Sequence, residues 1–443
     1  MSSHPTGPGS GSGSGSAEDL TPAERSVLDH LDEQALVESL VELVRIPSTG
    51  GSYAEVEVQE VAAGMLAGLD ADVDRWDIDV AELAADAWFP GAEVDRSEAV
   101  GVVGTVPGTG TTADVPALVL QGHLDVVPPG DPDSWLGVDP FSAEIRDGAL
   151  YGRGSCDMKA GVAANLAVVR TLQAAGIRLE RSLAVHCVVG EEDGGLGAFA
   201  TLRRGHTGEA AVITEPTSGA IVTATAGALT FRIEVAGRSA HGSMRHEGVS
   251  AFEAFLPVHA ALLDLEADRN RDPDPSFVAR MPFSLSFGVV HAGEWSSNVP
   301  DSLVAEGRFG VQIDEDPRLA RARFEDVVTA VAVEDPWLRD HRPVVTWPGG
   351  QFASGRIDVD HPLVGEMAGA VVATGGAVPQ RAMGVYGSDL RLYAGIGGIP
   401  TLHFGPGDMR AAHTPLEKVG LDQLVEVTRA LVLLAVRRCG VAA

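Results

Sequence analysis

The segment GHLDVVP, residues 122–128, places a histidine and an aspartate two positions apart directly after the apolar run Val115–Leu120. Side chains two apart on a strand point to the same side of a sheet, so His123 and Asp125 would face the same way where this predicted strand stops. A histidine and an aspartate in this spacing are often only hydrogen-bonded neighbours. Their chemical meaning therefore depends on which other side chains reach the same place.

Four more acidic residues stand close to the end of an apolar run or the start of a helix. They are Asp157 in the glycine-rich turn YGRGSCDMKAG, Glu191 and Glu192 after the run Leu183–Val189, and Glu215 after the run Ala211–Thr214. Ligands in open α/β sheets bind outside the carboxyl ends of the strands. Side chains that recur at strand ends should therefore converge on one edge of the sheet.

Several carboxylates gathered at one edge favour a bound cation. Like charges raise one another's pKa, and desolvation raises it further, so burying them without a cation is costly. Histidine and carboxylate ligands without a thiolate suit zinc, manganese or cobalt. Taken singly, Glu215 could instead be a helix cap or a solvated loop residue, and Glu191 and Glu192 could lie in a solvated turn.

A competing pattern is the sequence G-x-G-x-x-A at residues 195–200, with Glu215 about 20 residues further on. This spacing is typical of a nicotinamide-dependent oxidoreductase. However, two glutamates would then stand beside the pyrophosphate, which is electrostatically unfavourable. The pattern also leaves His123 and Asp157 unexplained. No G-x-S-x-G segment occurs, so a serine hydrolase is not indicated.

The elements that must position these residues alternate between strands and helices. Helices are predicted at Leu36–Arg45, at Gly161–Ala174 and from Leu196 to Arg203, among the three apolar runs. Such alternation predicts an α/β domain whose sheet contains parallel strands.

From residue 226 the pattern changes. The predicted elements there are Ala228–Val235 (strand), Ala251–Leu265 (helix), Ser284–Val290 and Val304–Ile313 (strands), Arg318–Val333 (helix) and Pro343–Trp347 (strand). This β-α-β-β-α-β order is typical of a ferredoxin-like domain. We therefore expect residues 226–350 to be inserted into a first domain made of 21–225 and 351–443, the latter with helices at Leu363–Thr374 and Leu421–Arg438.

Composition limits the class of protein. At 443 residues the chain is long enough for two domains, and its net charge of −30 argues against nucleic acid as the main partner. No apolar stretch reaches the roughly 20 residues of a membrane span. Residues 1–20 lack the features of a signal peptide and are expected to be a disordered Gly/Ser-rich tail. Three scattered cysteines do not form a disulfide framework, which fits a reducing cytoplasm.

The motifs together resemble the M20 metallopeptidases. The resemblance rests on GHLDVVP, YGRGSCDMKAG, GEEDGG, TEPT, SAHGS and FGPGDMRAAHTPLEKV, in family order between about residues 36 and 435. That family includes acetylornithine deacetylase, succinyl-diaminopimelate desuccinylase, aminoacylases and carboxypeptidase G. The segment AWFPGAEVDRSEAVGVVGT is most similar to the acetylornithine deacetylase-like deacylases. The resemblance implies a mixed-sheet α/β zinc-hydrolase domain with an inserted lid domain that often forms a homodimer.

The resemblance also implies a set of roles. Two divalent metal ions per chain are expected, zinc first, with cobalt or manganese as alternatives. Their ligands would be Asp157 as the bridge, Glu192 and His413 for one ion, and His123 and Glu215 for the other. Asp125 would orient His123, as an acid beside a ligating imidazole does. Glu191 would be the general base.

Three residues are implied to act on the substrate. His241 of the lid would hold the tetrahedral oxyanion, although alone it would be taken for a surface histidine. Asn298 and Arg391 match family positions that contact the substrate, and an arginine can hold a carboxylate with two hydrogen bonds. An ion pair with Asp389 is the alternative for Arg391. The segment after Asn298 is shorter than usual for the family, so Arg308 is left unassigned.

We therefore expect a dinuclear metal hydrolase that cleaves the amide bond of a small N-acylated amine or amino acid, with metal-bound water as the nucleophile. The acyl group could be acetyl, formyl, succinyl or a dipeptide residue. A carboxypeptidase or dipeptidase of the same family is one alternative. A nicotinamide-dependent oxidoreductase and a non-catalytic ligand-binding relative are the alternatives from other classes.

Overall fold

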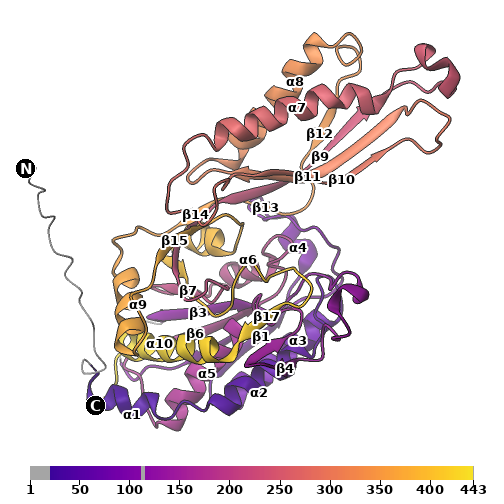
Figure 1. The fold of residues 1–443 in the computed structure, drawn as a ribbon. Coiled ribbons are helices and arrows are strands. Elements are labelled where there is room, and N and C mark those ends of the chain that lie inside the picture. Colours follow the sequence, from indigo (N-terminus) through magenta and orange to yellow (C-terminus); the bar gives the residue numbers. More distant parts are fainter. Residues whose placement is uncertain (1–19, 111–114, 443) are drawn as a thin grey trace, which may run out of the picture.

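The structure is a computed structural model that describes residues 20–110 and 115–442. The chain forms two parts, each built around a sheet. In Figure 1 the part with the larger sheet lies below the part with the smaller sheet. The disordered tail expected at residues 1–20 lies outside the described residues, apart from Leu20.

Nine strands of the described residues form the larger sheet, in the order β1-β2-β6-β3-β7-β16-β8-β14, with β15 beside β8. The strands are β1 Asp72–Asp77, β2 Val100–Val106, β3 Leu118–His123, β6 Leu183–Val188, β7 Ala211–Ile213, β8 Ile221–Thr225, β14 Gly355–Arg356, β15 Arg381–Gly384 and β16 Thr401–His403. The central strands β6, β3, β7 and β16 are parallel neighbours. The pairs β1–β2, β2–β6, β16–β8 and β8–β14 are antiparallel, so the sheet is mixed as expected.

Helices cover both faces of this sheet (Figure 1). They are α1 Pro22–Leu28, α2 Glu33–Val44, α3 Ala54–Ala67, α4 Val80–Ala84, α5 Lys159–Ala174, α6 Leu196–Arg203, α9 Pro362–Ala373 and α10 Leu421–Cys439. Successive residues of β3 alternate between the faces: Leu118 and Leu120 join the core under α2, α5 and α10, whereas Val119 joins the core under α6. No helix of residues 20–110 and 115–442 has both the length and the hydropathy needed to cross a bilayer.

Lys159 connects the start of α5 to the end of α2. Its buried Nζ donates hydrogen bonds to the carbonyl oxygens of Leu43, at 2.9 Å, and Ile46, at 2.7 Å. A cationic group is favourable at this place, because the last carbonyl groups of a helix point toward its C-terminus. The predicted helix Leu36–Arg45 is confirmed, although it begins three residues earlier because Asp32 caps it.

The smaller sheet contains five strands of the described residues, in the order β10-β11-β9-β12 with β13 beside β9, all antiparallel. Its elements are β9 Gly227–Ala236, α7 Ala251–Arg269, β10 Leu285–Ala292, β11 Ser302–Val311, α8 Pro317–Glu334, β12 Val344–Thr346 and β13 Gln351–Phe352. The helices α7 and α8 pack on one face and share a core with it (Figure 1). The predicted β-α-β-β-α-β order is therefore confirmed, while the limits 226–350 remain our proposal for the inserted domain.

A third, three-stranded sheet joins two motifs that are distant in sequence. Its strands are β4 Glu144–Arg146, β5 Ala149–Tyr151 and β17 Lys418–Gly420. Because β17 pairs antiparallel with β5, the segment that carries His413 lies beside the turn that carries Asp157. Short helical turns at Pro132–Trp135 (η2), Gly242–Glu247 (η3) and Leu392–Ile396 (η4) complete the described elements.

Candidate metal centre

Five of the predicted site residues meet at the carboxyl ends of the central strands. Potential ligand atoms lie within 4.8 Å of one another in two overlapping groups, His123–Asp157–Glu192 and His123–Glu191–Glu215. The Nε2 atom of His123, the last residue of β3, is 3.2 Å from Oδ1 of Asp157 and 4.0 Å from Oε2 of Glu191. Residues far apart in sequence therefore form a single cluster, as the strand-end argument predicted.

His413 reaches the same cluster from the opposite side of Asp157. Its Nε2 atom is 3.0 Å from the carboxylate of Glu192 and 3.5 Å from Oδ2 of Asp157. The two oxygens of Asp157 thus face different histidines, Oδ1 toward His123 and Oδ2 toward His413. This is the arrangement that a carboxylate shared between two cations needs.

Glu417 fixes the backbone that presents Asp157. Its buried carboxylate accepts hydrogen bonds from the N–H groups of Cys156, at 2.9 Å, and Asp157, at 3.0 Å, and from Nη1 of Arg153, at 2.5 Å. Glu417 was not predicted from the sequence, although it lies in the segment FGPGDMRAAHTPLEKV. Its position four residues after His413 was the available signal.

Asp125 acts on more than the histidine it was expected to orient. Its carboxylate accepts hydrogen bonds from the N–H groups of Glu191, at 3.3 Å, and Glu192, at 3.1 Å. The hydrogen bond to Nδ1 of His123 uses the main-chain carbonyl of Asp125, at 3.0 Å, whereas the nearer carboxylate oxygen is 3.6 Å away. The carboxylate is turned toward the backbone of the two glutamates, so it positions them as well.

Residues 190–195, which we call the glutamate loop, are also held by a buried ion cluster. Arg96 donates to Asp193 at 2.7 and 2.8 Å and to Glu55 at 2.9 Å, and its side chain is only 1% exposed. This cluster was not predicted from the sequence, because its members stand in three separate segments. No local pattern connects them.

The cluster concentrates negative charge where water is excluded. Burial raises the pKa of Glu191 well above its usual value, and the neighbouring charges of Glu215 and Asp389 raise it further. Burial, together with the charge of Asp157, does the same to Glu215. For His123, burial would lower the pKa, but the surrounding carboxylates raise it well above its usual value. A pair of divalent cations would relieve this conflict, so the donor set fits the predicted metals.

The predicted lid residues lie elsewhere. His241 and Asn298 are backbone partners in an isolated bridge of the smaller-sheet part, and His241 bonds Oγ of Ser243 at 2.8 Å. Both side chains are exposed. Within residues 20–110 and 115–442 neither forms a hydrogen bond or an ion pair with a member of the metal cluster.

Arg391 lies just before η4 and is buried, so it does not form the surface ion pair considered above. Its Nη1 donates to the carbonyl oxygen of Ser388 at 3.0 Å, and its Nη2 to that of Gly194 at 2.6 Å. The guanidinium carbon lies 4.0 Å from the ring centroid of Phe352. Burial lowers the pKa of Arg391 to about 10, and burial raises that of Asp389 to about 6 against the opposing charge of Arg391.

The glycines at 195 and 197 are explained by packing rather than by a nucleotide. Gly195 has φ +88°, and a Cβ atom there would lie 2.7 Å from Oδ1 of Asp389. A Cβ on Gly197 would lie 2.5 Å from the carbonyl oxygen of Val189. The start of α6 therefore faces the protein's own carboxylate, which leaves no place for a pyrophosphate.

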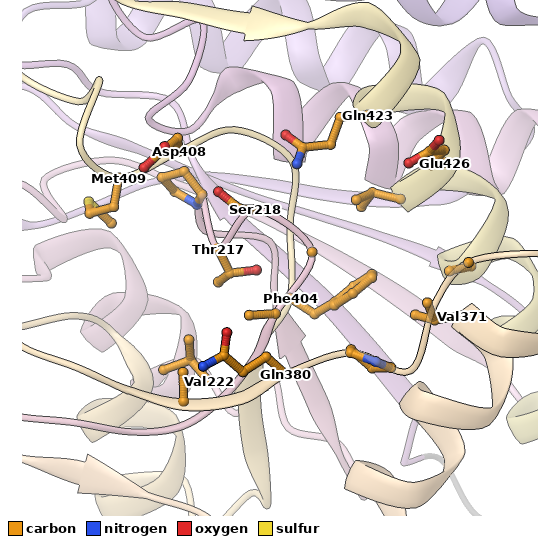
Figure 2. Close-up of a pocket in the computed structure, with 18 of the residues that line it drawn as sticks. Thr217, Ser218, Val222, Val371, Gln380, Phe404, Asp408, Met409, Gln423 and Glu426 are labelled. Carbon is orange, nitrogen blue, oxygen red and sulfur yellow. The ribbon is translucent and has the colours of Figure 1, made fainter. Parts of the chain in front are cut away.

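A cavity of about 1040 Å³ lies between the residues that follow β7 and the start of α10 (Figure 2). Pro216, the neighbour of Glu215, lines it, and so does Asp408, whose carbonyl oxygen accepts from Sγ of Cys156 at 3.3 Å. Polar side chains of Gln380 and Gln423 and apolar ones such as Phe404 complete much of the wall drawn in Figure 2. None of the predicted metal ligands is among the residues that line this cavity.

Comparison with known proteins places these motifs in one family. The profile of peptidase family M20/M25/M40 matches residues 119–437, a span that contains every residue of the metal cluster. Succinyl-diaminopimelate desuccinylase of Xanthomonas euvesicatoria is 31% identical over 298 residues, which are 64% of this chain and 73% of that protein.

Two further proteins are similar over nearly their whole length. N-formyl-4-amino-5-aminomethyl-2-methylpyrimidine deformylase of Bacillus subtilis is 28% identical over 94% of this chain and 97% of that protein. The crystal structure of a tripeptidase from Staphylococcus aureus has a TM-score of 0.70 at 20% identity, covering 92% of this chain and 99% of that one. This likeness confirms the predicted fold class.

Proposed function

The chain belongs to peptidase family M20/M25/M40, an amide-bond hydrolase family, and we propose that it is a dinuclear metal-dependent enzyme that removes a small acyl group from an amine. The observation that carries the proposal is the geometry of Asp157. Each of its oxygens faces a different histidine, and a glutamate stands beside each. His123 and Glu215 would hold one zinc ion, and Glu192 and His413 the other.

When bound, the metal ions would lower the pKa of a water molecule between them and polarise the carbonyl group of the substrate. Glu191 would accept the proton of that water and later deliver it to the leaving amine. Its burial supports this role, because a raised pKa lets a carboxyl group hold a proton near neutral pH. His241 would donate to the developing oxyanion once the smaller-sheet part, or that of a second copy, approaches the cluster.

For the substrate we propose an N-formylated or similarly small N-acylated amine. The support is the deformylase relative, which matches over 97% of its own length. Both Nη atoms of Arg391 already donate to main-chain carbonyl groups, so this arginine would have to rearrange before it could hold a substrate carboxylate. An N-acyl amino acid or a dipeptide is the alternative within the family.

The test is release of free amine from a panel of compounds by protein loaded with zinc, cobalt or manganese. The panel contains N-formyl, N-acetyl and N-succinyl derivatives of a heteroaromatic aminomethyl compound and of amino acids, together with dipeptides. We expect close to two metal ions per chain and fastest release from a formyl compound. High activity without bound metal would refute the mechanism. A clear preference for dipeptides would refute the proposed substrate and favour a dipeptidase.

We also propose a homodimer that forms through the smaller-sheet part. Large apolar side chains are exposed on α7, at Phe252, Leu256 and Leu263, and on the edge strand β10, at Val289 and Val290. An edge strand offers unpaired backbone groups that a second copy could pair with. Light scattering that gives the mass of a monomer at micromolar concentration would remove this proposal. The three free, buried cysteines support the expected reducing cytoplasm.

A further inference from the structure

The glutamate loop is connected to the smaller-sheet part by two routes that begin at one side chain. That side chain is Arg308 of β11, which the sequence analysis left unassigned. The first route contains no residue to which a role in metal or substrate binding was assigned, and the second contains one, Arg391.

The first route is an ion pair followed by backbone hydrogen bonds. Nη1 of Arg308 donates to Oε1 of Glu93 at 2.9 Å, and Oγ1 of Thr230 on β9 donates to the same oxygen at 2.7 Å. The N–H group of Glu93 in turn donates to Oδ2 of Asp193 at 3.0 Å, and that of Val94 does so at 3.1 Å. Asp193 directly follows Glu192, so the side chain of Glu93 is held by one part of the molecule and its backbone by the other.

The second route runs through an aromatic ring. The guanidinium carbon of Arg308 lies 5.4 Å from the ring centroid of Phe352, and that of Arg391 lies 4.0 Å from the same centroid. Arg391 then donates to the carbonyl oxygen of Gly194 at 2.6 Å. Asp193 and Gly194, two adjacent residues in the second half of the glutamate loop, are thus both connected to Arg308.

We propose that Glu93 and Arg308 are positioning residues that make the placement of Glu191 depend on the placement of the smaller-sheet part. The pair is partly exposed, with 40% of the Arg308 and 35% of the Glu93 side chain accessible, so its effect is modest and sensitive to charge. The loop itself is anchored by the buried Arg96 cluster and by Asp125, so losing the pair should loosen the loop without unfolding it. The kinetic part of this proposal rests on the proposed function, because it takes Glu191 as the base.

The experiment compares Glu93→Gln, Arg308→Gln and the charge exchange Glu93→Arg with Arg308→Glu in the full, zinc-loaded chain. The matched control is Arg232→Gln, because Arg232 of β9 pairs with Glu234 and Glu306 within the same sheet and forms no side-chain hydrogen bond or ion pair with a described residue of the larger part. Each single variant should lower kcat about five-fold while KM, metal content and Tm stay near wild type. The charge exchange should restore most of kcat, and the control should not change it.

Hydrogen exchange gives a readout that does not require activity. In both single variants the amide hydrogens of residues 190–195 should exchange with solvent several-fold faster than in wild type. In the double variant with exchanged charges they should again exchange at close to the wild-type rate. If wild type releases no amine but hydrogen exchange changes as described in the variants, the proposed function is wrong and the positioning role is supported. Unchanged kcat and unchanged exchange in Glu93→Gln and Arg308→Gln would overturn the positioning role. A lowered Tm or a lower metal content in these variants, not restored in the double variant with exchanged charges, would also overturn the positioning role.

Discussion

The two sets of predicted site residues have opposite surroundings. The metal cluster around Asp157 lies at the ends of parallel strands, and its members contact one another directly. His123, Asp157, Glu191 and Glu215 are buried, whereas His413 is half exposed. His241 and Asn298 are exposed on the smaller-sheet part, where they pair with each other and not with the cluster. Both sets were named from the sequence, but the first is complete in one chain and the second depends on how two parts, or two copies, come together.

The difference follows from how each set is positioned. Parallel strands bring their carboxyl ends to one edge whatever the rest of the chain does, so strand-end residues converge by a general rule. The position of the smaller-sheet part depends on contacts between two separate parts of the chain, among them the partly exposed Glu93–Arg308 ion pair, and a pair of this kind can rearrange at little cost in free energy. Mutations in the metal cluster should therefore abolish amide hydrolysis, whereas mutations of His241 and Asn298, which we call the lid set, should only lower its rate.

Substitution of the shared carboxylate should have the largest effect. Asp157→Asn removes the negative charge that both metal sites would use, so we expect loss of both ions and amine release at background level. Metal analysis of the purified variant, beside wild type prepared in the same way, is the measurement. Two ions retained per chain would show that Asp157 does not bridge them.

The second largest effect should separate the two adjacent glutamates. Glu191→Gln should keep both metal ions and lose about 10³-fold in kcat, because an amide cannot accept the proton of the attacking water. Glu192→Gln is the matched control, and it should lose metal from the site that includes His413. The geometry alone allows either glutamate to be a ligand, so the reverse pattern would exchange their roles.

The sequence predicted the cluster better than it predicted what supports it. His123, Glu192 and Glu215 could be located because each follows a recognisable apolar strand, and the pairing of β3 with β6 and β7 then brought them together. Arg96 and Glu55 could not, because their partnership exists only in the folded chain. No element was predicted between residues 46 and 115, so α3, β1 and β2 were missed, although Val100–Val106 is an apolar run. The strand before His123 also runs further than expected, because residues 122 and 123 stay paired with β6.

A smaller effect is expected in the lid set. His241→Ala should lower kcat about 10²-fold with metal content unchanged, since it removes one donor to the oxyanion. Mixing this variant with Glu191→Gln then tests where the histidine acts. If it serves the partner's cluster, the mixture should regain up to about a quarter of wild-type activity, because half of the randomly formed dimers hold one complete site of two. No recovery would place His241 in the site of its own chain.

The smallest effect concerns a buried polar residue of the larger part that carries no proposed chemistry. His186 of β6 bonds Tyr393 through Nδ1 at 2.7 Å, and its Nε2 has no partner among the described residues. Burial lowers the pKa of His186 to about 3, and the charge of His206 lowers it further. In the unfolded chain this histidine is protonated below about pH 6.5, whereas in the folded chain it stays neutral down to about pH 3. The free energy of unfolding therefore falls as the pH decreases from about 6.5 to about 3.

Replacing His186 with glutamine removes this proton but keeps a hydrogen-bonding group near Tyr393. Between pH 7 and pH 5, wild type should lose about 2 kcal/mol more unfolding free energy than His186→Gln, since each pKa unit corresponds to about 1.4 kcal/mol. Denaturant unfolding of both metal-free proteins at several pH values measures the difference, and the other titrating groups cancel because they are shared. Parallel pH profiles would mean that His186 is protonated in the folded protein. The larger part would then hold a buried positive charge that no carboxylate of the described residues pairs with, unlike Arg96, which is paired with Glu55 and Asp193.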